Sequence, residues 1–320
     1  MTGSSAAGRG RLGALRPLRH ALLTTGIVLA VCGVLAGVAA TTFAAASAHI
    51  GAATGRAEGV VEAVRDSAVQ LRWTPPGRAE RVDLVEVSGT PPAPGTRTEV
   101  AFDPARPDGP LIPGAQILVD ADRALTTLAF TVVVAVLVLA VFAWQVVTRR
   151  RAFAQPARSV PVRRVRWQAG LATHSYLETD THPQRWIPVH FDPVLVGLPS
   201  PTVARLHGDP LRDRMVAATV PGPDGDHPLV PSGPVRLEEP HGHRTDNPSR
   251  PDDTVAARAA ALARMRRQLR ADLPLVVPAP FIGLLWTYVD RGGVETWAAV
   301  TALTAAMGLW LAAIRGSDPT

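Results

Sequence analysis

Lysine is absent from the sequence, and all 33 basic residues are arginine. Enzymes that depend on a P-loop lysine, a Schiff-base lysine or a Ser-x-x-Lys pair therefore have no counterpart in this chain. Cysteine occurs once, as Cys32 inside an apolar run. A single cysteine excludes disulfides within the chain, Cys-x-x-Cys redox pairs and cysteine-based zinc or iron–sulfur sites.

Four segments lack charged residues and histidine altogether: residues 21–48, 125–147, 273–289 and 296–314. An apolar helix of about 20 residues crosses the roughly 30 Å hydrocarbon core of a bilayer. The sequence therefore predicts four transmembrane helices and the lipid bilayer as the first partner. Proton-coupled transport and charged permeation need ionisable groups inside the spans, and these segments hold none.

The distribution of arginine predicts how the chain crosses the membrane. Arg149, Arg150 and Arg151 follow the second apolar segment, and basic residues collect on the cytoplasmic side. Residues 1–20, 149–272 and 315–320 together carry +10, whereas residues 50–124 and 290–295 carry −4. We predict a multi-pass protein of the inner (cytoplasmic) membrane, with a disordered basic leader (1–20) and a short tail (315–320) both inside. Because the charge follows the topology, the net +6 does not indicate nucleic-acid binding.

Two of the spans have alternative interpretations. Ala46-Ser47-Ala48 has the small-x-small pattern of a signal-peptide cleavage site, although the apolar run is longer than the usual 7–15 residues. Small residues in this run, from Gly26 to Thr41, also fall at helical spacing and favour a packing face. A re-entrant hairpin is the alternative to two spans in residues 273–314, because Pro274, Pro278 and Pro280 interrupt the first part.

Residues 50–124 predict a small extracytoplasmic β module. Residues 58–64 and 67–74 are valine-rich and flank Arg65-Asp66, which indicates a hairpin. Residues 81–87 alternate apolar and charged side chains, and residues 98–102 follow a proline-rich break. Several short strands in about 60 residues favour an antiparallel, partly closed barrel of the OB or SH3 type.

Residues 148–251 predict a second β module, in the cytoplasm, with a proline-rich end. Five short strands are expected, at residues 163–171, 185–191, 202–207, 215–220 and 234–238. Residues 252–272 predict one basic amphipathic helix, which Asp252-Asp253-Thr254 would cap. That helix either lies on the inner leaflet or packs on the module.

The two soluble segments share a V-x-F-D-P pentapeptide, at residues 100–104 and 189–193. Valine and phenylalanine two apart face one side of a strand, aspartate accepts from nearby backbone N–H groups, and proline ends the ladder. The match is compatible with duplication of a β module. It is equally compatible with one strand-to-turn solution used twice.

The order of these features resembles a bacterial family of integral membrane proteins that carry a small β-rich domain of unknown function between transmembrane helices. The pattern G-x-x-x-x-V-x-F-D-P-x-x-P carries the resemblance over residues 20–150, through Gly95, Val100, Phe102, Asp103, Pro104 and Pro107. Residues 186–193, 206–208 and 231–234 resemble the cytoplasmic half of larger, actinobacterial-type members. The family lends an architecture and no activity.

Candidate sites are sparse. His241 and His243 lie near Glu238 and Glu239, and Asp224 and Asp226 precede His227, but both groups sit in Pro/Gly-rich loops without the spacing of a His-Glu-x-x-His site. Ser232 lies in a Pro-Ser-Gly-Pro turn rather than a G-x-S-x-G elbow. We therefore expect no catalytic, cofactor or metal residue. The predicted function is that of a non-enzymatic scaffold or signal relay that binds protein partners or itself, or else of an accessory subunit in a transporter or envelope enzyme complex.

Overall fold

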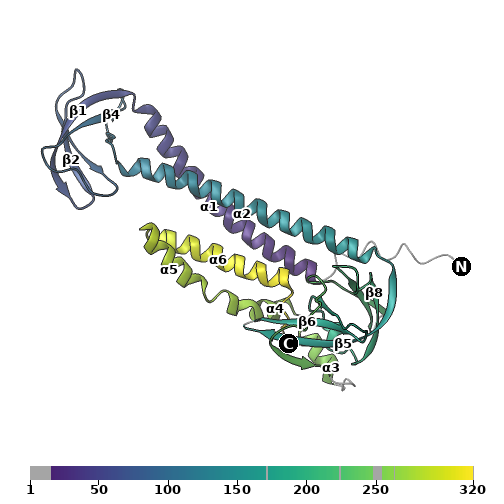
Figure 1. Cartoon of the computed structure of the whole chain (residues 1–320). Helices are drawn as coiled ribbons and strands as arrows, with labels where there is room; N and C mark the ends of the chain where they lie inside the picture. Colours follow the sequence, from purple (N-terminus) through teal and green to yellow (C-terminus); the bar gives the residue numbers. More distant parts are fainter. Residues whose placement is uncertain (1–15, 171, 223–224, 248–253, 263, 320) are drawn as a thin grey trace. The chain divides into compact units, whose positions relative to one another are not determined.

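The computed structural model describes residues 16–170, 172–222, 225–247, 254–262 and 264–319 (Figure 1). The chain forms two compact units. One is Cys32–Val134, and the other combines Met1–Val31 with Ala135–Thr320. Both consist of helices and antiparallel sheet, as the sequence predicts.

Among the described residues, three helices are long and apolar enough to cross a membrane. They are α1 (Arg16–Ala52), α2 (Gln116–Phe153) and α6 (Val294–Arg315). Such helices suit a bilayer because they satisfy their own backbone hydrogen bonds. A fourth candidate is the bent pair Met265–Leu275 and Ala279–Asp290, which turns by 42° at its break. Length and composition thus give three candidate spans in the described part of the chain, or four if the bent pair is one span.

Two of these helices extend beyond the predicted apolar segments. Helix α1 begins at Arg16, so the prediction that residues 1–20 form a disordered leader is wrong for residues 16–20, while residues 1–15 lie outside the described part of the chain. Helix α2 exceeds residues 125–147 at both ends. No proline or glycine lies within it, and Pro113 and Pro156 flank it, so nothing breaks the helix earlier.

The unit Cys32–Val134 contains a four-stranded sheet in the order β3-β2-β1-β4. Strands β1 (Gly55–Arg65) and β2 (Ala68–Trp73) form the predicted hairpin, which turns at Asp66 with a φ of 51°. Strands β3 (Arg81–Glu86) and β4 (Arg97–Phe102) confirm the other two predictions. Its core comprises Val61, Leu71, Trp73, Val100 and Phe102 with five further buried residues.

This sheet is rolled but does not close into a barrel. The segment after β4 makes one bridge from Leu111 to Ala101 of β4 and one from Ala115 to Val87, just beyond β3. Two single bridges do not amount to a ladder, and the sheet path ends at β3 and β4. The sequence predicts a partly closed barrel, but the structure has an open sheet. The segment after β4 makes single bridges near both edges of that sheet.

The unit Met1–Val31 with Ala135–Thr320 contains a seven-stranded antiparallel sheet, whose main path runs β10-β9-β8-β5-β6-β7. Strand β11 pairs with β5 off that path. The strands are β5 (Ala157–Ala169), β6 (Ala172–Thr179), β7 (Trp186–Val189), β8 (Thr202–His207), β9 (Ala217–Gly222), β10 (Gly225–Leu229) and β11 (His243–Asp246).

Four of the five strands predicted here are present, and the fifth prediction is wrong. Residues 234–238 make only a single bridge, between Arg236 and Trp186, and the last strand is β11. Strands β6 and β10 were not predicted. In β6 the residues from Ser175 to Thr179 are all buried, so the strand lacks the alternation that marks a half-buried one.

The helices that precede the last span are broken. Residues 252–272 do not form one helix, because α3 (Thr254–Leu262) and α4 (Met265–Asp272) are separate and Arg264 between them has an extended backbone. Asp252 and Asp253, the proposed caps, lie outside the described residues. A short 3-10 turn, η3 (Leu273–Leu275), then leads into α5 (Ala279–Asp290). Pro274, Pro278 and Pro280 fall at these starts, which confirms the predicted break.

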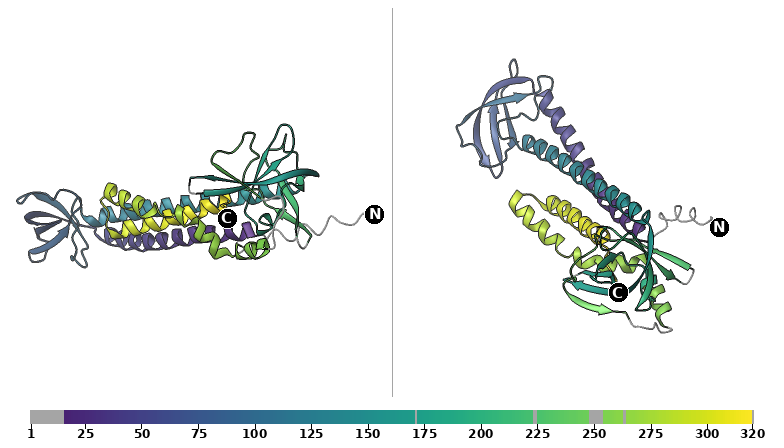
Figure 2. Two further views of the ribbon diagram at one scale, coloured as in Figure 1. Left: turned by 90° about the horizontal axis from the view of Figure 1, so that it is seen from below. Right: turned by 45° about the vertical axis from the view of Figure 1, so that its right-hand side comes forward.

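Helices α5 and α6 lie side by side as a hairpin (Figures 1 and 2). The chain reverses at Arg291, which has a φ of 52°, and the indole of Trp297 donates to the Pro280 carbonyl at 3.1 Å. Gly283 permits the close approach, because a Cβ there would lie 3.0 Å from the Trp297 carbonyl oxygen. Such small residues are what helix pairs in membranes use to pack closely.

Candidate functional site

The most unusual feature of the larger unit is a buried polar cluster where its helix ends meet the seven-stranded sheet. We call it the polar junction. Its residues come from α1, α2, β5, β6, the segment after β7, α4 and the segment after α6. They are Arg16, His20, Arg149, Arg164, Ser175, His190, Gln268, Asp272, Ser317 and Asp318.

The segment after α6 enters the junction instead of forming a free tail. Helix α6 ends at Gly316, whose φ is 73°, and a Cβ there would lie 2.7 Å from the Ser232 Cβ and 3.0 Å from His190 Nδ1. Only glycine fits both the left-handed backbone and the space. Beyond it Asp318 donates its backbone N–H to the Thr173 carbonyl at 2.8 Å. Of the short tail predicted at residues 315–320, Ser317 and Asp318 are buried in the junction.

Asp318 forms the most buried ion pair among the described residues. Its Oδ2 accepts from Arg164 at 2.9 Å and from the Ser175 hydroxyl at 2.5 Å, and the Arg164 and Asp318 side chains are 2% and 0% exposed. Burial lowers the pKa of Arg164, and the negative charge of Asp318 opposes that shift. The same guanidinium also donates to the Leu195 carbonyl at 3.1 Å and to the Asn247 amide oxygen at 3.2 Å. Such multiple bonding is what a buried charge requires.

Asp272 ties α1 and α4 to the same segment. Its Oδ1 accepts from the Ser317 hydroxyl at 2.5 Å, and its Oδ2 lies 3.2 Å from His20 Nε2 of α1. That second contact is close but is not directed as a hydrogen bond. The Gln268 amide donates to the Ser317 carbonyl at 2.9 Å, and the Arg16 guanidinium donates to the Gln268 amide oxygen at 3.3 Å.

Arg149, at the end of α2, connects the remaining parts. Its guanidinium donates to His190 Nε2 at 2.7 Å, to the Pro231 carbonyl at 3.2 Å and to the Ile314 carbonyl at 3.5 Å. Burial, and then the charge of Arg149, hold the pKa of His190 well below its usual value. His190 is therefore neutral and accepts through Nε2.

The junction does not have the geometry of a catalytic triad. Ser317, Asp272 and His20 are adjacent, but the carboxylate lies between the hydroxyl and the imidazole. In Ser–His–Asp catalysis the imidazole contacts the hydroxyl and takes its proton. What these groups do here is hold three chain segments together.

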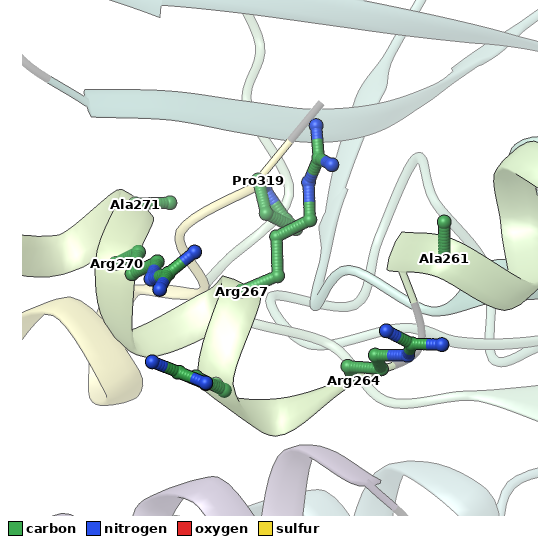
Figure 3. A pocket seen from close by; sticks show the side chains of 7 residues that line it. Ala261, Arg264, Arg267, Arg270, Ala271 and Pro319 are labelled. Atoms are coloured by element: carbon green, nitrogen blue, oxygen red, sulfur yellow. The ribbon is translucent and has the colours of Figure 1, made fainter.

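Two pockets open beside the junction. The smaller has a volume of about 210 Å³ and is lined in part by Asp272, Ser317 and Asp318. The larger has a volume of about 490 Å³, and we call it the arginine pocket (Figure 3). Its walls are Ala261, Ala271 and Pro319 with four arginines, Arg264, Arg266, Arg267 and Arg270.

Comparisons with protein-family models, curated proteins and solved structures gave no match.

The residues considered from sequence as metal ligands lie elsewhere and do not converge. His241, His243 and Glu238 are exposed, while Glu239 lies 3.4 Å from the Arg244 guanidinium. Arg244 is held mainly by Glu178 and Asp246, each at 2.8 Å. Over the described part of the chain, no three His, Cys, Asp or Glu side chains are grouped to hold a metal ion.

The second candidate group was Asp224, Asp226 and His227. Asp226 of β10 pairs with Arg205 of β8, and Asp224 lies outside the described residues. His227 Nε2 lies 3.1 Å from Asp192, and this carboxylate raises the pKa of that histidine. Ser232 packs beside Gly316 as a turn residue.

Sequence reasoning missed the junction as a site. Its members are scattered from Arg16 to Asp318, and none belongs to a short motif. One signal was available: Arg16, His20, Arg149 and Asp318 all lie just outside the ends of apolar segments. Polar residues at such positions are normal for membrane proteins, so only the tertiary structure distinguishes them.

Proposed function

We propose that this chain is a non-enzymatic protein of the bacterial cytoplasmic membrane that scaffolds partners and relays their binding across the bilayer. In this proposal four helical segments cross the membrane, with residues 50–124 outside and residues 148–251 inside. Both chain termini are cytoplasmic. The architecture is that of the resembled bacterial family, and the outer sheet is a variant of the small OB or SH3-type barrel.

The polar junction carries this proposal. A module on a loose linker would not follow the movement of a helix. Here the end of α2 and the segment after α6 bind the sheet region through buried polar contacts. The start of α1 and α4 are joined to that segment through His20, Gln268 and Asp272. Buried networks of this kind have discrete arrangements and resist gradual deformation. A shift of one helix end would therefore alter the contacts of the others.

Three exposed apolar side chains around Arg72 on one face of the four-stranded sheet support a protein partner. Leu84 and Val82 of β3 are 62% and 49% exposed, and Val60 of β1 is 38% exposed. Val82 and Val60 both pair with Arg72, which places the three on one face. Strand β3 also ends the sheet path, so it offers a free edge for strand addition.

The test is photo-cross-linking in living cells with p-benzoylphenylalanine in place of Leu84, and with the same probe in place of Arg106, an exposed residue in the segment after β4, as the control. We expect protein adducts from position 84 that are several-fold stronger than those from position 106. The partner's identity then decides between two roles. A signalling or envelope protein, or a second copy of this chain, supports the relay and scaffold. A transporter or synthase subunit supports the accessory role. Equal or absent adducts at both positions would contradict the docking face.

A further inference from the structure

The arginine pocket combines a concave shape with unusually concentrated positive charge. Arg264, Arg266, Arg267 and Arg270 fall within seven consecutive residues and all line one space of about 490 Å³. Figure 3 shows Arg267 extending alongside Pro319, with Arg264 on one side of it and Arg270 on the other. Arg267 and Arg270 are one turn apart on α4 and so lie on the same helix face.

These guanidinium groups are not neutralised within the part of the chain that the structure describes. Arg164, Arg205 and Arg244 each lie within ion-pair distance of a carboxylate. None of the four arginines in the pocket has such a partner among the described residues. Like charges this close on a helix repel one another, so an anion between them would be stabilising.

The other walls explain which anion fits. Ala261, Ala271 and Pro319 present small or apolar side chains, so the guanidinium groups supply the hydrogen-bonding side chains of the pocket. The planar guanidinium binds phosphate oxygens through two parallel N–H donors and stays charged at all physiological pH values. A single phosphate group with a small substituent suits this volume.

The sequence context brings this pocket close to a lipid surface. Three residues after Arg270 the chain enters η3 and then α5, which together supply the apolar part of the fourth candidate span. The arginines thus precede an apolar segment, where headgroup phosphates of a bilayer would lie.

We propose that Arg264, Arg266, Arg267 and Arg270 form a binding site for a phosphate group, borne either by an anionic phospholipid headgroup or by a small soluble compound. This site is independent of the relay role and of any partner on β3. The arginine pocket adjoins the polar junction, because Ala271 and Pro319 also line the smaller pocket, together with Asp272 and Asp318.

The experiment titrates the full-length protein in neutral detergent micelles with two probes. One is phosphatidylglycerol carrying a fluorescent acyl chain, and the other is inorganic phosphate. The test variant is Arg267→Gln with Arg270→Gln. The matched control, Arg163→Gln with Arg214→Gln, removes the same charge from exposed arginines of the same unit. All four positions are exposed, so we expect equal melting temperatures.

We expect saturable binding of one probe, a loss of affinity of about tenfold or more in the test variant, and a change of less than about twofold in the control. Binding of phosphatidylglycerol alone identifies a lipid site, and binding of inorganic phosphate identifies a soluble ligand. Saturable binding that both variants weaken equally would overturn the proposal, because it would reflect net charge. Absence of saturable binding of either probe would overturn it as well.

Discussion

His190 shows how single buried side chains determine the chemistry of this protein. It lies against the charged Arg149, and burial together with that charge lowers its pKa. A histidine in water has a pKa of about 6.5, whereas His190 must stay neutral to accept the hydrogen bond from Arg149. Its role is to satisfy a buried guanidinium, and protonation would place two positive charges in one dry site.

The first prediction concerns the pH dependence that follows. Because folding lowers the pKa of His190, the unfolded chain binds a proton at this residue more readily than the folded chain does. Its contribution to stability is therefore complete above about pH 6.5 and is lost as the pH falls towards its folded pKa. His190→Gln keeps an acceptor for Arg149 without the titration. We expect the variant to lose less unfolding free energy than the wild type between pH 8 and pH 5, as measured by urea denaturation in detergent.

Other histidines make the comparison with the variant necessary. Burial lowers the pKa of His174, which gives the same sign as His190. Asp192 raises the pKa of His227, so its contribution is present below pH 6.5 and lost as the pH rises. Only the difference in the pH dependence of the unfolding free energy between wild type and variant isolates the contribution of His190. Parallel curves for the two proteins would show that His190 has no part in the acid sensitivity.

At the scale of elements, the short segment after α6 is the one that fixes the helices to the sheet. Asp318→Ala would leave the Arg164 guanidinium buried without its carboxylate. Breaking a buried ion pair by removing one partner costs about 3–5 kcal/mol. We expect a loss of that size in the unfolding free energy of the larger unit. The measurement is the fluorescence of its six tryptophans, among which Trp167 and Trp186 are buried beside the sheet.

The matched control for this prediction is Asp226→Ala, which breaks an exposed pair with Arg205. Their side chains are 61% and 51% exposed, and pairs of this kind contribute about 1 kcal/mol or less. Equal destabilisation by the two substitutions would mean that the segment after α6 does not anchor the module.

Strand topology bears on the shared pentapeptide. Strands β1 to β4 have the order 3-2-1-4, and β5 to β8 have the same arrangement, 7-6-5-8. The pentapeptides do not match within it, because Phe102 ends β4 while Phe191 follows β7. In both, the aspartate accepts from the N–H two residues on, Asp103 at 2.8 Å and Asp192 at 3.0 Å. The pentapeptide is thus a strand-ending motif that the chain uses twice. The feature that is compatible with duplication is the shared strand order of the two sheets.

At the scale of the whole molecule, orientation decides whether the relay proposal has a physical basis. Cys32 is the sole cysteine, so single cysteines can be introduced after Cys32→Ser. In intact cells we expect a membrane-impermeant maleimide to label Thr90→Cys strongly and Arg212→Cys only after permeabilisation. Both positions are exposed. The reverse pattern would invert the topology and remove the basis of the proposed function.

The same experiment tests the number of spans. Val294 lies at the start of α6 and is 78% exposed. With four spans the α5–α6 turn faces outside, so Val294→Cys should be labelled in intact cells. A re-entrant hairpin would leave it unlabelled until the cells are permeabilised.

The amino-acid sequence by itself determined the features that depend on local pattern. Long uncharged runs produce α1, α2 and α6, alternation and turn residues produce β1 to β4, and prolines break the chain before α5. These are consequences of periodicity and backbone chemistry within a few residues. Strand β6 escaped prediction because its burial depends on neighbours from distant parts of the chain.

Only the tertiary structure decided the polar junction and the arginine pocket. Arg164 and Asp318 are 154 residues apart, and nothing near either residue indicates the other. The four arginines are visible as a basic run, yet the pocket exists because Pro319 and Ala261 fold beside them. The energy of a buried charge is set by its surroundings in space, and only the folded chain brings those surroundings together.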